Sequence, residues 1–353
     1  MSAPCSDATA GKTTRVQTET ELSLLYRILR SVIKPLRPRL VKPGKPQPPG
    51  STRLLSYPRE KNGITIRERR HGSSGVWLYD FETVSSPNIK IKTPSTIYYF
   101  AGGAFQSPPS SQHWSFISKL ANNLVLEHHF TLVSYPLAPN SPASESLPTL
   151  RKLLRSLLTD ASKKGDKVIL MGDSSGGNVA LSLGFWWAGE IARSGNYKLR
   201  STLESLIVIS PAVDLRNCNP SISEIDSRDP LLGLKYTFAV AEAWAAAPPM
   251  DSSRTSSTED PHLSPLLHSA SSFQQLAELG IAIHGLYGTC DVLAPDAELF
   301  RCKCEEHGVK GKWLVWVDQM HCFVLAGVYG MKEGRTGIEW ITKLLKEVIA
   351  TEP

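Results

Sequence analysis

The stretch VILMGDSSGGN, residues 168–178, decides the fold, because it reads as a short buried strand that turns sharply into a helix. Gly172, Ser174 and Gly176 form a G-x-S-x-G pattern, whereas a pattern centred on Ser175 would need glycine at position 173, which is aspartate. Small residues on both sides of a serine permit a strained turn that exposes one hydroxyl above the edge of a sheet. The next backbone N–H, at the start of the helix, then points at a developing oxyanion. We therefore expect Ser174 to be a nucleophile and Ser175 to contribute its amide.

The pentapeptide alone is a weak signal, because glycine and serine are common in this chain. A glycine-rich phosphate loop is the main structural alternative, but the Gly-Lys-Ser/Thr ending and the G-x-G-x-x-G pattern are both missing. A nucleophilic serine on such a turn also requires an acid and then a histidine, each on a turn after a later strand. The residues downstream therefore decide between the two interpretations.

One histidine and one aspartate downstream of Ser174 have suitable positions. The other histidines in this part of the chain lie in a long insertion, inside a strand or at a helix end: His262, His268, His284 and His307. His321 remains, in the turn DQMHCF between the last predicted strand and the last predicted helix. Asp291 follows the strand IAIHGLYGTC and is the preferred acid, with Asp214, after VISPAVD, as the alternative. The order serine, acid, histidine is the one that a serine hydrolase of this kind requires.

A second oxyanion donor is expected from the loop after an earlier strand. The predicted strand TIYYF leads directly into Ala101-Gly-Gly-Ala-Phe105, whose glycines allow the backbone to approach a substrate closely. A plain tight turn would have the same composition. Together with the three side chains above, however, this loop completes the set of features expected of a serine-hydrolase site.

The rest of the chain alternates between strand and helix patterns. The predicted strands are Ile64–Glu68, Val76–Phe81, Thr96–Phe100, Thr131–Tyr135, Lys167–Met171, Leu206–Ser210, Ile281–Tyr287 and Lys312–Val317. Helical patterns cover about 111–127, 143–164, 176–193, 295–307 and 335–350. This alternation predicts an α/β fold, a mostly parallel, doubly wound sheet with helices on both faces. The connection between Ser210 and Ile281 is too long for a simple crossover, and we expect its apolar helix, Leu231–Ala247, to belong to a lid.

The positive charge of the chain is concentrated at its N-terminus. Residues 1–50 hold nine Lys/Arg and three acids, and the other 303 residues balance. A basic segment on a neutral body argues against nucleic-acid binding. We expect residues 1–17 to be disordered, a helix to follow the possible capping box Thr18–Glu21 and to end near Lys34, and residues 40–50 to form a Pro-rich linker. The stripe Leu22, Leu25, Tyr26, Leu29, Val32 and Ile33 fits a basic membrane anchor, but we favour packing on the body as part of a lid, without stable membrane anchoring.

Targeting and metal signals are absent from the sequence. The first twenty residues lack the apolar core of a secretory signal, and no apolar run reaches membrane-spanning length. The six cysteines show no paired framework, and Cys302-Lys-Cys304 has no second pair with metal-ligand spacing. These observations predict a cytoplasmic protein without a bound metal.

Seven segments resemble the hormone-sensitive-lipase-like esterases of the α/β-hydrolase superfamily, over about residues 53–350. They are AGGAF (101–105) for the family's HGGGF, YPLAPNSPAS (135–144), GDSSGGN (172–178) for GDSAGGN, SPAVDL (210–215), DPHLSPL (261–267), GTCDVLAPD (288–296) and MHCF (320–323) for the H-G-F region. The resemblance implies a triad of Ser174, Asp291 and His321, with Gly102, Gly103 and Ser175 as amide donors. It also implies an N-terminal extension with a cap helix (1–50), and a catalytic domain (51–353) with a cap insertion at 215–260.

The chain departs from the family pattern in the oxyanion loop. Ala101 replaces the family's histidine, which usually braces this loop, and Ala104 replaces the third glycine. The support of the loop must therefore differ. Family members that lost hydrolysis, such as the plant gibberellin receptor, generally lost a triad residue, and this chain has kept all three.

The sequence as a whole predicts a carboxylic-ester hydrolase that acts on a bulky or apolar small molecule and needs no cofactor. The expected pocket walls are Phe105, Trp114, Tyr236, Phe238 and Trp244. Similarity to fungal chains of the type AGGAFQSPPSSQHW indicates a role in secondary metabolism, and the oligomeric state, a homodimer included, stays open. The alternatives are an acyltransferase or lyase on the same scaffold, and a ligand-binding receptor with a vestigial triad.

Overall fold

The computed structural model describes residues 13–37, 41–42, 44–83, 95–125, 127–246 and 257–350. Its strands are β1 (Thr14–Glu19), β2 (Glu60–Lys61), β3 (Ile64–Arg70), β4 (Trp77–Thr83), β5 (Ser95–Phe100), β6 (His128–Ser134), β7 (Lys167–Asp173), β8 (Leu203–Ile209), β9 (Ala282–Gly288) and β10 (Gly311–Trp316). Its α-helices are α1 (Leu24–Ile33), α3 (Ser111–Asn123), α4 (Ala143–Lys164), α5 (Ser175–Ser194), α6 (Ser221–Asp226), α7 (Leu234–Ala245), α8 (Ala270–Leu279), α9 (Ala294–Glu306) and α10 (Lys332–Ala350).

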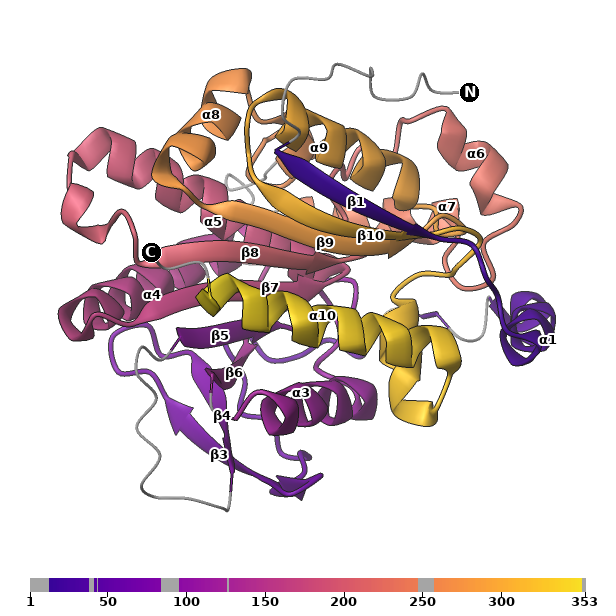
Figure 1. Cartoon of the computed structure of the whole chain (residues 1–353), viewed down its shortest axis with the longest axis horizontal. Coiled ribbons are helices and arrows are strands. Elements are labelled where there is room, and N and C mark those ends of the chain that lie inside the picture. The colour runs from indigo at the N-terminus through magenta and orange to yellow at the C-terminus, as the bar shows by residue number, and fades with distance from the viewer. Residues whose placement is uncertain are drawn as a thin grey trace.

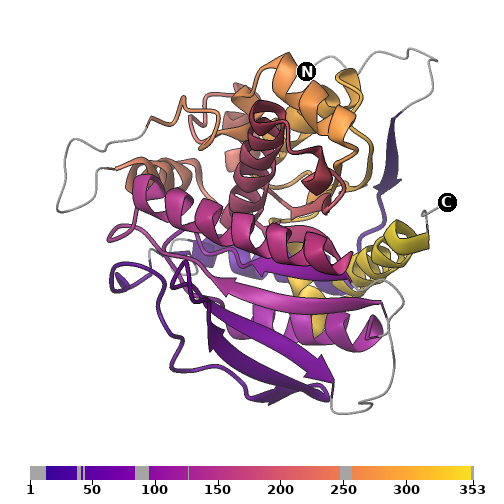
Figure 2. The same cartoon turned by 90° about the vertical axis from the view of Figure 1, so that its left-hand side faces the viewer.

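The strands form one sheet in the order β1-β10-β9-β8-β7-β5-β6-β4-β3-β2. The pairs from β1 to β6 are parallel, and β4, β3 and β2 continue the sheet in antiparallel pairs. Helices cover both faces of the sheet (Figures 1 and 2). The predicted fold, an α/β-hydrolase fold with a mostly parallel sheet, is confirmed, and each of the eight predicted strands is present.

Two hydrophobic cores lie on opposite faces of the sheet, and the stretch that opened the sequence shows why. In β7, Val168 and Leu170 belong to the core under α4, α5 and α9, while Ile169 and Met171 belong to the core under α3 and α10. A strand covered on both faces needs apolar residues at successive positions, which explains an uninterrupted apolar run instead of an alternating one.

The first edge of the sheet corrects the expectation of disorder at residues 14–17. These residues lie in β1, which pairs in parallel with β10 from Thr14 opposite Gly311 to Glu19 opposite Trp316. Most side chains of this strand are exposed, so its sequence shows little apolar periodicity. The strand is held by backbone pairing with a strand that is distant in sequence, which a local pattern cannot reveal. The sheet therefore begins well before residue 51. Residues 1–12 lie outside the described part of the chain.

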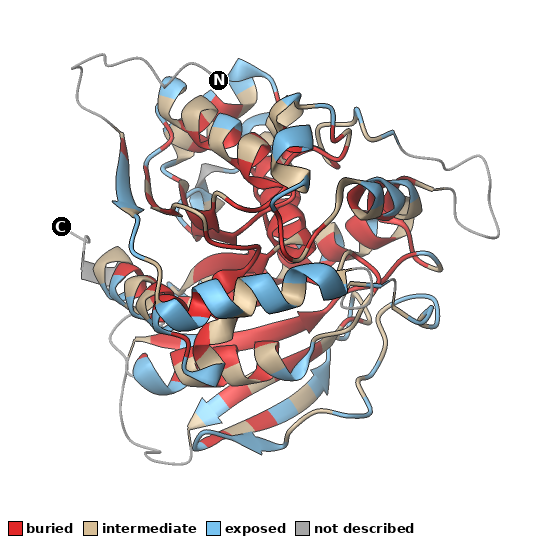
Figure 3. Cartoon of the chain, turned by 90° about the vertical axis from the view of Figure 1, so that its right-hand side faces the viewer, coloured by how far each residue is buried: buried red, intermediate tan, exposed pale blue. Residues whose placement is uncertain are grey.

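Helix α1 corrects two further expectations. It is capped by Ser23, whose hydroxyl accepts the Tyr26 N–H, and not by the box at Thr18–Glu21. Tyr26 is buried, but Leu25 and Val32, which were expected to pack on the body, are exposed. In Figure 3, α1 follows β1 and runs across the front of the molecule with much of its surface exposed.

The long connection between β8 and β9 carries α6, α7 and α8. The predicted helix over 231–247 is α7, which is shorter, while α8 was not predicted. The Ser/Thr-rich loop and the end of the predicted helix lie largely outside the described residues. Cys302 is disulfide-bonded, contrary to the expectation of unpaired cysteines, whereas Cys218, Cys290, Cys304 and Cys322 are free thiols.

Within the described ranges, no helix is both long enough and apolar enough to span a bilayer.

Candidate active site

Ser174 lies at the sharp turn between β7 and α5, as its motif predicts. Its backbone has φ 52° and ψ −122°, a strained conformation for a residue with a side chain. The flanking glycines are required by close backbone contacts: a Cβ on Gly172 would lie 2.4 Å from the Gly176 carbonyl carbon, and one on Gly176 would lie 1.9 Å from Phe100 O. The turn is held by the Ser174 N–H, which donates to Ile209 O at 2.8 Å.

His321 and Asp291 meet on the loops after β10 and β9. The Nδ1 atom of His321 lies 2.7 Å from Asp291 Oδ2, and the Asp291 side chain is fully buried. The other carboxylate oxygen accepts the Leu293 N–H at 3.0 Å, which fixes the orientation of the group. Burial alone would lower the pKa of His321, but the negative charge of Asp291 and hydrogen bonds to Asp291 and Cys322 outweigh it and raise that pKa well above its ordinary value.

Asp214, the alternative acid, is engaged elsewhere. Its carboxylate forms a two-pronged ion pair with the Arg216 guanidinium, with Oδ2 at 2.7 Å from Nη2 and Oδ1 at 3.0 Å from Nε. The structure thus brings Asp291, and not Asp214, to His321.

Ser174 and His321 line one cavity of about 290 Å³. Its floor comes from the turns after β5, β7 and β10, and its walls from the insertion and from Val41 and Lys42 of the N-terminal segment. No hydrogen bond joins Ser174 to His321, whose Nε2 instead lies 3.4 Å from Cys322 Sγ. Without a substrate, hydrogen bonds of this kind are often not yet formed.

The oxyanion loop is held by a buried carboxylate that the sequence did not single out. Asp173 Oδ1 accepts the Gly102 N–H at 2.8 Å and the Tyr99 hydroxyl at 2.7 Å, and Oδ2 lies 3.2 Å from His113 Nε2. His113 Nδ1 accepts the Ser110 N–H, so its Nε2 carries the proton that is donated to Asp173. Burial would raise the pKa of Asp173, but the His113 imidazole and these hydrogen bonds outweigh it and lower that pKa.

This network holds the oxyanion loop, in which Ala101 stands where the family has histidine, and it changes the expected donors. The Gly102 N–H is occupied by Asp173 and is not a free oxyanion donor. Gly103 and Ser175 line the cavity, and their N–H groups form no hydrogen bond with any residue that the structure describes.

The five expected pocket residues separate into three groups. Phe105 and Tyr236 line the cavity, and Trp244 lies behind Phe105, with parallel rings whose centroids are 4.4 Å apart. Trp114 is not part of the wall, because it packs in the core under α3 against Tyr57, Tyr79 and Phe81. Phe238 is also outside the wall: it is 42% exposed on the outer side of α7. An aromatic residue near a motif does not reveal which side of its helix faces the site.

Two further residues next to the triad were missed. Asp229, on the insertion, is buried and accepts the N–H groups of Leu231, Leu232 and Val292, the last of which follows Asp291. Burial and the neighbouring charge of Asp291 raise the pKa of Asp229 to about 6. No motif marks it, since Asp before Pro reads as a helix start.

Cys322, the second missed residue, occupies the position of glycine in the family's H-G-F region. It keeps a positive φ of 49° and lines the cavity beside His321.

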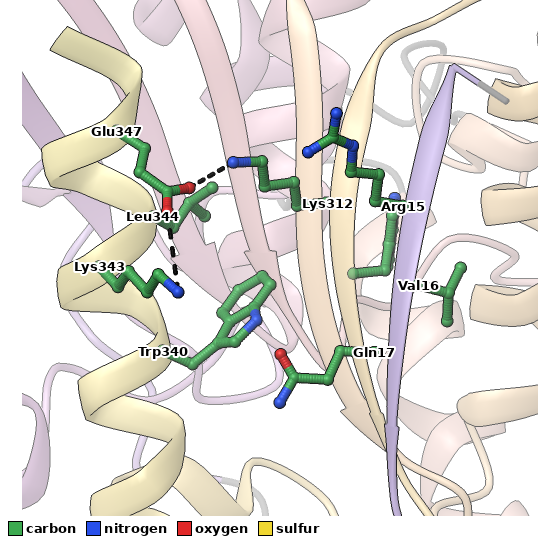
Figure 4. Close-up of a pocket in the computed structure, with 9 residues that line it drawn as sticks. Arg15, Val16, Gln17, Lys312, Trp340, Lys343, Leu344 and Glu347 are labelled. Atoms are coloured by element: carbon green, nitrogen blue, oxygen red, sulfur yellow. Dashed lines mark hydrogen bonds and ion pairs between the residues drawn. The ribbon is translucent and has the colours of Figure 1, made fainter. Parts of the chain in front are cut away.

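A second groove, of about 300 Å³, lies between β1 and α10 (Figure 4). Glu347 there pairs with Lys312 and lies 4.0 Å from Lys343, beside Arg15 and Trp340. None of the predicted catalytic residues lines it. No group of three or more His, Cys, Asp or Glu side chains suited to a metal ion is found in the described ranges.

A family model for the alpha/beta hydrolase fold matches residues 97–325. The chain belongs to this family. An esterase of Acinetobacter venetianus is 29% identical over 244 residues, which cover 68% of this chain and 72% of that protein. This agrees with the predicted resemblance to esterases of the superfamily.

Solved structures share the fold. Carboxyl esterase 2 of the mycorrhizal fungus Tuber melanosporum superposes with a TM-score of 0.70 at 19% identity, over 93% of this chain and 99% of that one. A hormone-sensitive lipase from a metagenome library gives a TM-score of 0.65 at 20% identity, over 93% of both chains. The resemblance to hormone-sensitive-lipase-like proteins is confirmed. The role in fungal secondary metabolism and the cytoplasmic location stay predictions.

Proposed function

We propose that the protein is a serine hydrolase that cleaves a carboxylic ester of an apolar small molecule through an acyl-enzyme on Ser174. One observation carries this proposal. Ser174, at a strained turn, lines the same cavity as His321, whose other nitrogen lies 2.7 Å from the buried carboxylate of Asp291. A nucleophile, a base and a group that orients the base are the parts that acyl transfer needs.

The mechanism follows from these positions. Ser174 Oγ attacks the ester carbonyl carbon while His321 Nε2 accepts the hydroxyl proton. His321 returns this proton to the leaving alcohol, and a water molecule, activated in the same way, then releases the acid. Asp291 keeps the Nδ1 proton of His321 in place and stabilises the imidazolium that forms.

The N–H groups of Gly103 and Ser175 would stabilise the oxyanion that forms during the reaction. Ser175 is the first residue of α5, so its N–H has no partner within the helix and carries the positive end of the helix dipole. Donors fixed by the surrounding backbone stabilise the oxyanion without rearrangement during the reaction.

The cavity favours an ester of modest size over a bulky one. Its volume of about 290 Å³ is at the lower limit of small-molecule sites, and aliphatic side chains from the insertion supply much of its wall. Leu215, Leu231, Leu232 and Val240 are among them. A short or medium apolar acyl or alcohol group fits such a wall.

A fluorophosphonate probe and p-nitrophenyl esters of increasing acyl length test the proposal. Labelling and turnover are expected in the full-length protein, with the highest kcat/KM for short and medium chains, and both are expected to disappear in Ser174→Ala. Absence of labelling in the folded wild type would favour the ligand-binding receptor. Labelling without ester hydrolysis, together with turnover of the p-nitrophenyl ester that begins only when an alcohol acceptor is added, would favour the acyltransferase.

A further inference from the structure

Helix α1 has two apolar sides, and only one of them is covered. Tyr26 is 1% exposed, and Leu22, Leu29 and Ile33 pack against the core under α3 and α10. The neighbouring side presents large aliphatic side chains to solvent: Leu24 (74% exposed), Leu25 (60%), Ile28 (54%), Val32 (55%) and Leu36 (40%). Four of these recur at every fourth position, so they form one stripe along the helix and the turn that follows it. We call these five side chains the outer stripe.

The outer stripe is unusual for this molecule. Ten large hydrophobic side chains are exposed in the described part of the chain, and five of them lie in these 13 residues. Scattered exposed hydrophobic residues need no explanation, whereas a contiguous group on one helix marks a contact surface.

The stripe is held rigidly on the body. Tyr26 Oη donates to Asp318 O at 3.0 Å, the Ser23 N–H donates to Glu333 Oε1 at 2.6 Å, and Arg37 Nη2 donates to Asp226 Oδ1 at 2.7 Å. The helix is therefore already formed and oriented, and binding through the outer stripe does not have to order it.

The segment that carries the outer stripe is basic. Residues 22–50 contain seven Lys/Arg and no Asp or Glu. Arg30 and Arg37 are engaged with acids of the body, but Arg27 and Lys34, both exposed, form no ion pair with any residue that the structure describes. An apolar stripe flanked by unpaired cations fits an anionic lipid surface, where the side chains enter the acyl boundary and the cations meet the headgroups. A second copy fits less well, because a two-fold contact would place these cations against each other.

The stripe lies at the end of the sheet that carries the site. In Figure 1, α1 lies beyond the carboxyl ends of the strands, the end at which Ser174 and His321 sit. The chain continues from α1 through Arg37, which also donates to Asp229 O, to Val41 and Lys42 in the cavity wall. A surface that binds α1 therefore lies at the same end of the sheet as the cavity.

We propose that the outer stripe adsorbs reversibly on an anionic bilayer surface and brings the cavity close to it. The stripe recognised in the sequence is a different one: most of it packs on the body as expected, and only Leu25 and Val32 belong to the outer stripe. One short helix with a few cations gives reversible binding and not a permanent anchor. The advantage for catalysis, access to apolar esters dissolved in the bilayer, rests on the function proposed above; the binding does not.

Co-sedimentation of the full-length protein with vesicles tests the proposal. The vesicles are phosphatidylcholine with 30% phosphatidylglycerol, or phosphatidylcholine alone, at low and at physiological salt. We expect at least tenfold stronger partitioning to the anionic vesicles, weakening as salt screens the cations. Leu25→Glu/Ile28→Glu is expected to lower this partitioning at least tenfold. The control Leu55→Glu/Leu299→Glu adds the same two charges at exposed positions outside α1 and is expected to leave it unchanged.

Three outcomes would overturn the proposal: no binding by the wild type, equal binding by Leu25→Glu/Ile28→Glu, or a wild-type dimer that becomes monomeric in that variant. The last result would assign the stripe to a second copy. Turnover of soluble p-nitrophenyl acetate serves as the folding control and is expected to be the same in both variants. Ser174→Ala is expected to bind vesicles like the wild type, so failure of the proposed catalysis and failure of adsorption are distinguishable.

Discussion

Two buried carboxylates, Asp173 and Asp229, hold the loops on either part of the candidate site, and both are engaged in several hydrogen bonds. Asp173 holds the oxyanion loop and accepts from Tyr99, Gly102 and His113. Asp229 holds the loop that carries the acid and accepts three backbone N–H groups, from Leu231, Leu232 and Val292. Their pKa values nevertheless shift in opposite directions, down for Asp173 and up to about 6 for Asp229.

The neighbours of the two groups explain the difference. Burial raises the pKa of both carboxyls, but Asp173 faces an imidazole, whereas Asp229 faces the carboxylate of Asp291. Hydrogen bonds alone therefore do not decide whether a buried carboxyl keeps its charge. Near the oxyanion loop, Asp173 stays negatively charged. Near the catalytic acid, Asp229 and Asp291 can lie close together because Asp229 keeps its proton to a higher pH.

Ser174→Ala tests whether Ser174, which lies between the loops that Asp173 and Asp229 hold, is the nucleophile. We expect kcat for a short p-nitrophenyl ester to fall by about 10⁶-fold, as when a nucleophile is removed from a triad. Ser175→Ala, the matched control, is expected to stay within about tenfold, because only the amide of residue 175 is used. Equal losses in the two variants would show that the nucleophile is misassigned.

Asp291→Asn tests the acid side. We expect kcat/KM to fall about 10⁴-fold, since the imidazole loses the group that fixes its tautomer. His321 must be neutral to accept the proton of Ser174, so with its raised pKa the wild-type activity is expected to rise with pH through a value above 6.5. Because the charge of Asp291 raises that pKa, this rise is expected at lower pH in the variant.

Asp214→Asn is the control for Asp291→Asn, because Asp214 pairs with Arg216 and not with His321. It is expected to change kcat/KM far less and to keep the wild-type pH profile. A larger loss from Asp214→Asn than from Asp291→Asn would assign the acid to Asp214.

Asp173→Asn tests the oxyanion side. The amide cannot accept from every group that donates to Asp173, so we expect the loop around Gly102 to loosen and the Gly103 N–H to be displaced. We expect kcat to fall about 10²-fold, comparable to the loss of one oxyanion donor, with a smaller change in KM. A loss in KM alone would show that the network shapes the pocket without acting on the oxyanion.

Asp229→Asn tests the raised pKa of Asp229, which shifts in the direction opposite to that of Asp173. The native state holds a proton on Asp229 up to about pH 6, against an ordinary value of 3.8. Between about pH 4 and pH 6 the native state therefore binds more protons than the unfolded state, and stability falls as pH rises. The difference of about two pH units corresponds to about 3 kcal/mol.

Denaturant unfolding at several pH values measures this slope. The Asn variant is expected to lack this pH dependence. The loss of one hydrogen-bond acceptor lowers its free energy of unfolding by the same amount at every pH and does not change the slope. The same slope in both proteins would locate the shifted proton elsewhere.

Cys322→Gly has the smallest expected effect. Glycine relieves the positive φ of 49°, which is worth about 1 kcal/mol of unfolding free energy. Burial raises the pKa of the Cys322 thiol to about 11, so iodoacetamide is expected to react slowly at pH 7. Rapid alkylation with loss of activity in the wild type, but not in the variant, would show that the thiol is accessible beside His321.

The sequence predicted the features that depend on local periodicity and on the order of residues along the chain. The apolar run of β7 and the glycines around Ser174 report local geometry, and the order of Ser174, Asp291 and His321 reports strand ends that a parallel sheet brings together. Chain order could not reveal Asp173 and Asp229 as supports, because the contacts that give them this role, Asp173 with Gly102 and Asp229 with Val292, join positions far apart in sequence. Any buried carboxyl also needs donors, so burial alone does not mark a support. Strand β1 was missed for the same reason, because its partner is β10.

The pairing of β1 with β10 has a consequence for how the chain is made. Thr14 pairs with Gly311, about 300 positions later, so β1 finds its place only after β10 has been synthesised. Until then the edge of the growing sheet is open, and a product that stops before β10 leaves β1 without a partner. Because β1 lies near α10 across one groove (Figure 4), a circular permutant that starts after α1 and links α10 to β1 would synthesise β10 and β1 in close succession.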